Sequence, residues 1–100
     1  MLLEEREYYK PFVYPWAFEF YKRQQQMHWL PDEVPLQDDI KDYNHKLSEG
    51  ERTLIDNIFK FFTQADVDVC CGYAKHYLPT FKQPEIRMML VSYAAMEAVH

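Results

Sequence analysis

Residues 48–78 read SEGERTLIDNIFKFFTQADVDVCCGYAKHYL, and this stretch decides the fold. Ser48, followed three residues later by Glu51, forms the pattern of a capping box, in which each side chain accepts a hydrogen bond from the other residue's backbone N–H. Because Pro79 disfavours a helical conformation at the residue before it, we expect one long helix over residues 49–78. Apolar residues recur along it at helical spacing, namely Ile55, Ile58, Phe59, Phe62, Val69, Cys70, Tyr73 and Tyr77.

Two further helices are predicted, one on each side of the long one. Residues 16–29 contain no Gly, Pro or Asn, and Pro15 suits the first position of a helix. Pro84 and Glu85 suit the first turn of a helix over residues 84–100. The link before that helix is short, so it should run antiparallel to the long helix. The remaining segments, 1–14 and 30–47, should be an extended arm and a surface connection with a helical turn near residues 38–43.

The composition supports an ordered, all-α fold and excludes several functions. In 100 residues, 48% are apolar and only 2 are Gly, which is enough for one modest core. The net charge of −5 argues against binding to nucleic acid or to an anionic membrane. No apolar run approaches a membrane span, and the acidic start does not fit a secretory signal. The adjacent Cys70 and Cys71 favour reduced thiols in the cytoplasm. Because the last helical pattern has no stop signal, we expect the N-terminal part of a longer protein.

Ionisable residues interrupt the apolar faces of both long helical patterns. Asp66 falls on the stripe of residues 48–78, whereas Asp68 lies about 200° round the helix and should face solvent. Glu97 and His100 continue the apolar face of the last helix, and their i, i+3 spacing allows both side chains to coordinate one ion. An unpaired ionised carboxylate among apolar side chains is unfavourable, so it must be protonated, paired or bound to a metal.

Each of these residues also has a simpler interpretation. A lone carboxylate on an apolar stripe is more often a hydrogen bonder between helices than a metal ligand. The Glu-x-x-His pattern alone arises by chance. Together they are more specific, because carboxylate-bridged di-metal bundles combine Glu-x-x-His helices with helices that give single carboxylates. This chain would supply one helix of each kind.

Three stretches together resemble the small, radical-generating subunit of class I ribonucleotide reductase. They are MHWLPDEVPL (residues 27–36), FFTQADVDV (residues 61–69) and Pro84-Glu85 followed by AAMEAVH (residues 94–100), and the similarity extends from about residue 11 to residue 100. The resemblance implies a ferritin-like helical bundle, of which residues 1–100 are the N-terminal part of a single di-metal domain. It also implies that Asp66, Glu97 and His100 ligate the first metal of a dinuclear centre. Iron is the expected metal, with Mn/Fe or Mn/Mn as alternatives, because oxygen-rich sites suit these metals.

The same resemblance implies partners and an electron relay. Trp29 matches the tryptophan that carries an electron between the metal centre and a large catalytic subunit, which reduces ribonucleotides to deoxyribonucleotides. Without the resemblance, Trp29 would be read as an aromatic residue packed at the end of the first helix. Family membership implies a homodimer, and the radical tyrosine of the family would lie beyond His100. The alternatives left open are a di-iron oxidase acting directly on an apolar ligand, a ferritin-like iron store and a metal-free helical interaction module.

Overall fold

The structure, a computed structural model, describes residues 1–99, and in that range it contains helices and no strand. The all-α prediction is therefore confirmed. The helical elements follow the irregular arm of residues 1–14 in the order α1 (Pro15–Gln26), the 3-10 turn η1 (Pro31–Glu33), α2 (Gln37–His45), α3 (Glu49–Gly72), the π turn η2 (Tyr73–Tyr77), α4 (Leu78–Thr80) and α5 (Pro84–Val99). The molecule is elongated, with extents of 57 × 25 × 15 Å. None of the described helices is long and apolar enough to cross a membrane.

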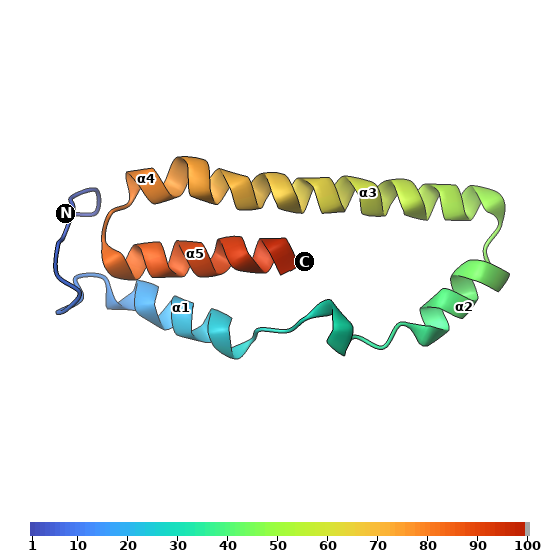
Figure 1. The fold of residues 1–100 in the computed structure, drawn as a ribbon, viewed down its shortest axis with the longest axis horizontal. Helices are drawn as coiled ribbons and strands as arrows, with labels where there is room; N and C mark the ends of the chain where they lie inside the picture. The colour runs from blue at the N-terminus through green and yellow to red at the C-terminus, as the bar shows by residue number, and fades with distance from the viewer. Residues whose placement is uncertain (100) are drawn as a thin grey trace.

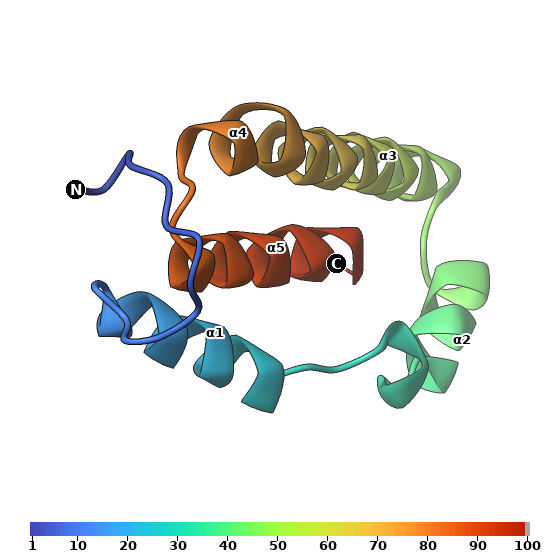
Figure 2. The same cartoon turned by 60° about the vertical axis from the view of Figure 1, so that its left-hand side comes forward.

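Helix α5 is the central element of the fold. It runs antiparallel to the long rod formed by α3, η2 and α4, and α1 lies along its other side in the parallel direction (Figures 1 and 2). Two neighbours enclose it, so α5 supplies most of the buried apolar side chains. The core is formed by Ala17 of α1 with Ile86, Met89 and Leu90 of α5.

The start of α3 confirms the predicted cap. The backbone N–H of Glu51 donates to the Ser48 hydroxyl over 3.2 Å, and the backbone N–H of Ser48 donates to the Glu51 carboxylate over 3.2 Å. These two bonds satisfy donors that an uncapped helix would leave without partners.

The other end of the rod extends past its predicted end at residue 78. The backbone N–H of Leu78 donates to the carbonyl of Tyr73, five residues earlier, which defines the π turn. Pro79 has no N–H, and its ring would clash with the carbonyl four residues earlier in a regular α-helix. The wider turn just before Pro79 allows the helical path to continue to Thr80, whose hydroxyl donates to the carbonyl of His76 over 2.6 Å.

Two predictions for the first half of the chain need correction. Helix α1 ends at Gln26 rather than at residue 29, so Trp29 lies in the connection that follows it. Pro31 holds Leu30 in an extended conformation with φ −110° and ψ 150°, so the helix could not continue through residue 30. The turn expected near residues 38–43 is a nine-residue helix, α2.

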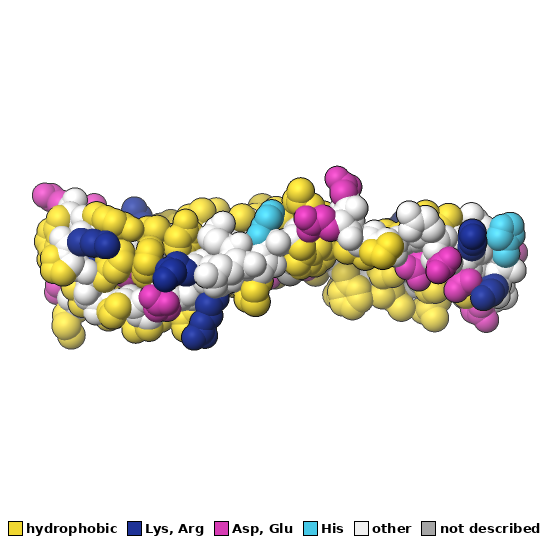
Figure 3. Space-filling view, turned by 90° about the horizontal axis from the view of Figure 1, so that it is seen from below, with side chains coloured by type: hydrophobic (Ala, Val, Ile, Leu, Met, Phe, Trp, Pro, Cys, Tyr) yellow, Lys and Arg dark blue, Asp and Glu magenta, His cyan; other side chains and the backbone are white. Residues whose placement is uncertain are grey.

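The apolar stripe of α3 is covered only in part. Helix α5 packs against the C-terminal half of the rod, and no residue of α3 is fully buried. Phe59 and Phe62 are 63% and 55% exposed, although their spacing predicted a core position. Figure 3, which views the molecule from the opposite side to α3, shows hydrophobic side chains on the surface there as well, whereas charged side chains gather over α2.

Candidate metal centre

A contact between two tyrosines fixes how α3 and α5 are aligned. The rings of Tyr73, at the start of η2, and Tyr93, in α5, lie 6.4 Å apart between centroids. Asp66 precedes Tyr73 by two helical turns, or about 10.5 Å, and Glu97 follows Tyr93 by about 6 Å along its axis. Because the helices are antiparallel, both displacements point the same way. Asp66 and Glu97 therefore lie within about one turn of each other, on neighbouring helices.

These two carboxylates share an environment that is unusual for acidic residues. Both are half-buried, and within residues 1–99 neither makes a hydrogen bond or an ion pair. Asp68, two residues after Asp66, is exposed and accepts a hydrogen bond from Gln64 over 3.0 Å, as expected for a solvated residue. The carboxylate oxygens of Asp66 and Glu97 are thus available to coordinate a metal ion.

Burial and the nearby Glu97 both act on the phenol of Tyr73. Burial raises the pKa of Tyr73 above its ordinary value of 10.0, and the charge of Glu97 raises this pKa further. Glu97 shares the α5 face of Tyr93, four residues earlier, and the Tyr93 ring contacts Tyr73.

Trp29 lies at the same end of the helices as the two carboxylates. The Gln25 amide in α1 donates to the Ser92 hydroxyl in α5 over 3.1 Å, which aligns these two parallel helices. Trp29 follows Gln25 by four residues, and Glu97 follows Ser92 by five. The connection that carries Trp29 therefore leaves α1 near the level of Glu97, and Trp29 is 39% exposed.

The expected ligand set is brought together in part. Asp66 and Glu97 share one level, and His100 lies outside the described residues. Among residues 1–99 there is no group of three or more His, Cys, Asp or Glu side chains that could hold a metal ion. The two carboxylates nevertheless fit one side of an iron or manganese site, because these ions accept oxygen ligands and neither carboxylate has an ion-pair partner among the described residues.

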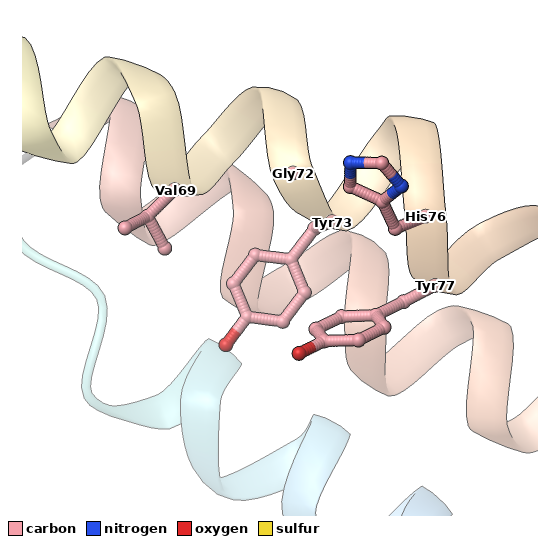
Figure 4. Close-up of a pocket in the computed structure, with 5 residues that line it drawn as sticks. All are labelled: Val69, Gly72, Tyr73, His76 and Tyr77. Carbon is pink, nitrogen blue, oxygen red and sulfur yellow. The ribbon is translucent and has the colours of Figure 1, made fainter.

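Two aromatic residues lie within one to two helical turns of the carboxylates. Tyr73 and Tyr93 contact each other between α3 and α5, whereas Phe59 and Phe62 are exposed and do not form part of a core. Next to Tyr73 the surface holds an open groove of about 440 Å³, drawn in Figure 4 and lined by Val69, Gly72, Tyr73, His76 and Tyr77.

Sequence reasoning missed one buried polar cluster. Glu85 was interpreted as a carboxylate at the start of a helix, but it is completely buried and pairs with Arg6 at 2.6 Å. A signal was present, because Glu85 shares the helical face of Met89 and Met96, both buried. Nothing in the sequence pointed to Arg6 as its partner.

The helical fold and the two carboxylates are consistent with one class of protein. Single carboxylates and Glu-x-x-His pairs that project from neighbouring antiparallel helices are the arrangement of carboxylate-bridged metal proteins. The family described as "Ribonucleotide reductase, small chain" matches residues 6–100, and the chain belongs to this family. Its helical structure agrees with the ferritin-like fold of that family.

Individual relatives carry names of the same kind. The chain is 48% identical, over 99 residues, to a probable ribonucleoside-diphosphate reductase small subunit of Invertebrate iridescent virus 6. It is 46% identical over 99 residues to the corresponding protein of Invertebrate iridescent virus 3, and 30% identical over 90 residues to the ribonucleoside-diphosphate reductase small subunit of Dictyostelium discoideum. These matches cover 99%, 99% and 90% of this chain but only 28%, 26% and 27% of the relatives, so the chain spans about a quarter of their length.

Proposed function

We propose that this chain is the N-terminal part of a ribonucleoside-diphosphate reductase small subunit that works in the cytoplasm with a large catalytic subunit. The observation that carries the proposal is the pair Asp66 and Glu97, two half-buried carboxylates at one level of neighbouring helices with no ion-pair partner among residues 1–99. The names of the relatives support the reaction class.

Asp66, Glu97 and His100 would hold the first metal of a dinuclear centre. The two carboxylates supply anionic oxygen ligands, and the spacing of Glu97 and His100 allows both to reach one ion. Iron is the metal we propose, and manganese suits the same donors. When bound, the centre supplies a one-electron oxidising equivalent.

Other residues of the chain would shield the metal centre from water and transfer the electron to the large subunit. Tyr73 and Tyr93 pack between α3 and α5 within one to two helical turns of the carboxylates, and their rings would reduce the contact of the centre with water on that side. Trp29, at the level of Glu97 and partly exposed, would pass the electron between the centre and the large subunit. The ribonucleotide would be reduced in the large subunit, and the small subunit would act as a homodimer.

The relay is tested by replacing each tryptophan of the chain in the complete small subunit. Trp29→Phe should keep its bound metal and lose turnover of ribonucleoside diphosphates when mixed with the large subunit. Trp16→Phe is the matched control, because Trp16 is also partly exposed but lies near the start of α1, away from Glu97. If Trp29→Phe turned over as fast as Trp16→Phe, the relay would be wrong.

A further inference from the structure

A line of contacting tyrosine rings leads from the candidate metal centre to the surface. Tyr93 contacts Tyr73 with ring centroids 6.4 Å apart, and Tyr73 contacts Tyr77 at 5.5 Å. Both contacts are close to edge-on, with interplanar angles of 63° and 67°. The proposed function uses Tyr73 and Tyr93 only as packing and does not use Tyr77.

The exposure of the rings gives this line a direction. Tyr73 and Tyr93 are half-buried, and Glu97 follows Tyr93 by one helical turn on the same face of α5. Tyr77 is 50% exposed and lines the open groove beside η2. Figure 4 shows the Tyr73 and Tyr77 side chains leaving the rod on the same side, with both rings turned into that groove. The line thus begins one helical turn from Glu97 and ends at an exposed ring.

The alignment of the two rings depends on the local helix. They are four residues apart, which places them on one face. The π turn spans residues Tyr73–Tyr77, and π turns are frequent at functional sites. Gly72, directly before it, leaves open space on that side of the rod, because a Cβ atom added there would meet nothing within 4 Å.

We infer that Tyr73 and Tyr77 form a discharge path that carries an unused oxidising equivalent from the metal centre to the protein surface. This inference rests on the proposed function, which names the oxidant: a high-valent iron or manganese centre. Trp29 leads away from Glu97 toward α1 and its connection, whereas this path leads along the rod, so the two routes are separate.

The steps of the path balance in electrons and protons. Tyr73 gives one electron to the oxidised centre and releases its phenolic proton, which leaves a neutral tyrosyl radical. Tyr77 then gives one electron to that radical and releases its own phenolic proton to water in the groove, while Tyr73 takes up a proton again. The net change is one electron gained by the centre, one proton released and one radical on Tyr77, which a soluble thiol can reduce by hydrogen-atom transfer.

The path is tested in the complete small subunit without the large subunit, so that the oxidising equivalent has no productive acceptor. The protein is loaded with iron(II), exposed to oxygen with a nitroso spin trap, and digested for peptide mass spectrometry. Tyr9 is the internal control, because it is 49% exposed and makes its ring contact with Phe12 instead of Tyr73. We expect several times more spin-trap adduct on Tyr77 than on Tyr9, and no excess in the zinc-loaded protein.

Two variants separate the path from simple surface reactivity. Tyr73→Phe keeps the ring but raises its oxidation potential, so the excess adduct on Tyr77 should disappear. Tyr21→Phe changes another half-buried tyrosine that packs against the core and contacts Phe18, and the excess should persist. The wild-type comparison of Tyr77 with Tyr9 needs no variant and is unaffected if Tyr73→Phe folds poorly.

The outcomes distinguish this inference from the proposed function. If iron binds and is oxidised but Tyr77 and Tyr9 are trapped equally, the discharge path is wrong and the metal centre stands. If the protein binds no iron, the metal centre fails and the path fails with it.

Discussion

Arg6 and Glu85 form a buried ion pair that ties the N-terminal arm to the start of α5. The Arg6 Nη2 atom lies 2.6 Å from Glu85 Oε2, and both residues are buried. Arg6 also donates to the side chain of Gln83 over 2.9 Å, and Gln83 in turn donates to the carbonyl of Glu4 over 2.8 Å. The arm therefore holds the end of α5 opposite to Glu97, on the helix that supplies most of the core.

Arg6→Ala should strongly destabilise the complete protein. Removing one partner of a buried ion pair leaves an uncompensated buried charge and costs about 3–5 kcal/mol in the free energy of unfolding. Urea unfolding measures this loss. Lys22→Ala is the control, because its contact with Glu19 is exposed and 3.9 Å long, and its loss should cost less than about 1 kcal/mol. Equal losses in the two variants would show that the Arg6 pair is not buried in solution.

The same pair should tolerate joint replacement by apolar residues. Buried ion pairs replaced by hydrophobic residues of similar volume are often neutral or more stable. The double variant Arg6→Met, Glu85→Leu should therefore recover much of the stability lost in Arg6→Ala, as measured by urea unfolding. No recovery would indicate that the bonds of Arg6 to the Tyr8 and Tyr9 carbonyls, and not its charge, anchor the arm.

Tyr43 should make the stability of the protein depend on pH in the alkaline range. Its hydroxyl donates to both carboxylate oxygens of Asp56, at 2.9 and 3.0 Å, and this hydrogen bond is the main reason that the pKa of Tyr43 is raised above 10.0. A raised pKa in the folded state gives stability that is complete below pH 10.0 and is lost as the pH rises through the raised pKa. The difference in the free energy of unfolding between wild type and Tyr43→Phe should accordingly be constant as the pH approaches 10.0 and decrease as the pH rises through the raised pKa.

Asp56→Asn provides the complementary measurement. The substitution weakens the hydrogen bond and removes the negative charge, so the pKa of Tyr43 should fall. Ultraviolet titration of tyrosinate in Asp56→Asn, compared with the same variant carrying Tyr43→Phe, isolates this residue. A pKa of Tyr43 that is unchanged by Asp56→Asn would show that α2 does not dock on α3 through this bond.

The cap of α3 should contribute measurably to stability. Ser48→Ala removes the acceptor for the Glu51 N–H, and loss of such a cap costs about 0.5–2 kcal/mol. Ser48→Asp is the control, because aspartate caps equally well and should retain most of the stability in urea unfolding. A loss in Ser48→Asp as large as that in Ser48→Ala would assign the effect to something other than the cap.

Local features of the fold were predictable because their causes lie within a few residues. The cap of α3 depends on Ser48 and Glu51, three positions apart, and it was predicted correctly. The pairing of Arg6 with Glu85 joins residues 79 positions apart, and no pattern in the sequence links them. The end of the rod was placed too early, because the rule for Pro79 does not anticipate that a π turn relieves the clash.

The candidate site was predictable to the extent that helical periodicity decides it. Asp66 and Glu97 were selected because they fall on apolar faces, and the Tyr73–Tyr93 contact brings those faces together. Periodicity could not reveal that Phe59 and Phe62 are exposed, because it indicates which face is apolar and not what covers it. The ligand role of His100 stays a prediction.

The most direct test of the metal centre compares two aspartates that lie two residues apart. Asp66→Ala and Asp68→Ala remove the same charge from α3, one on the side of α5 and one from an exposed position bonded to Gln64. Binding of iron(II) and manganese(II) to the complete small subunit is measured by calorimetry and by metal analysis of the purified protein. We predict that Asp66→Ala loses metal whereas Asp68→Ala binds as much as wild type. Equal metal binding by both variants would contradict the assignment of Asp66 and Glu97 as a metal site.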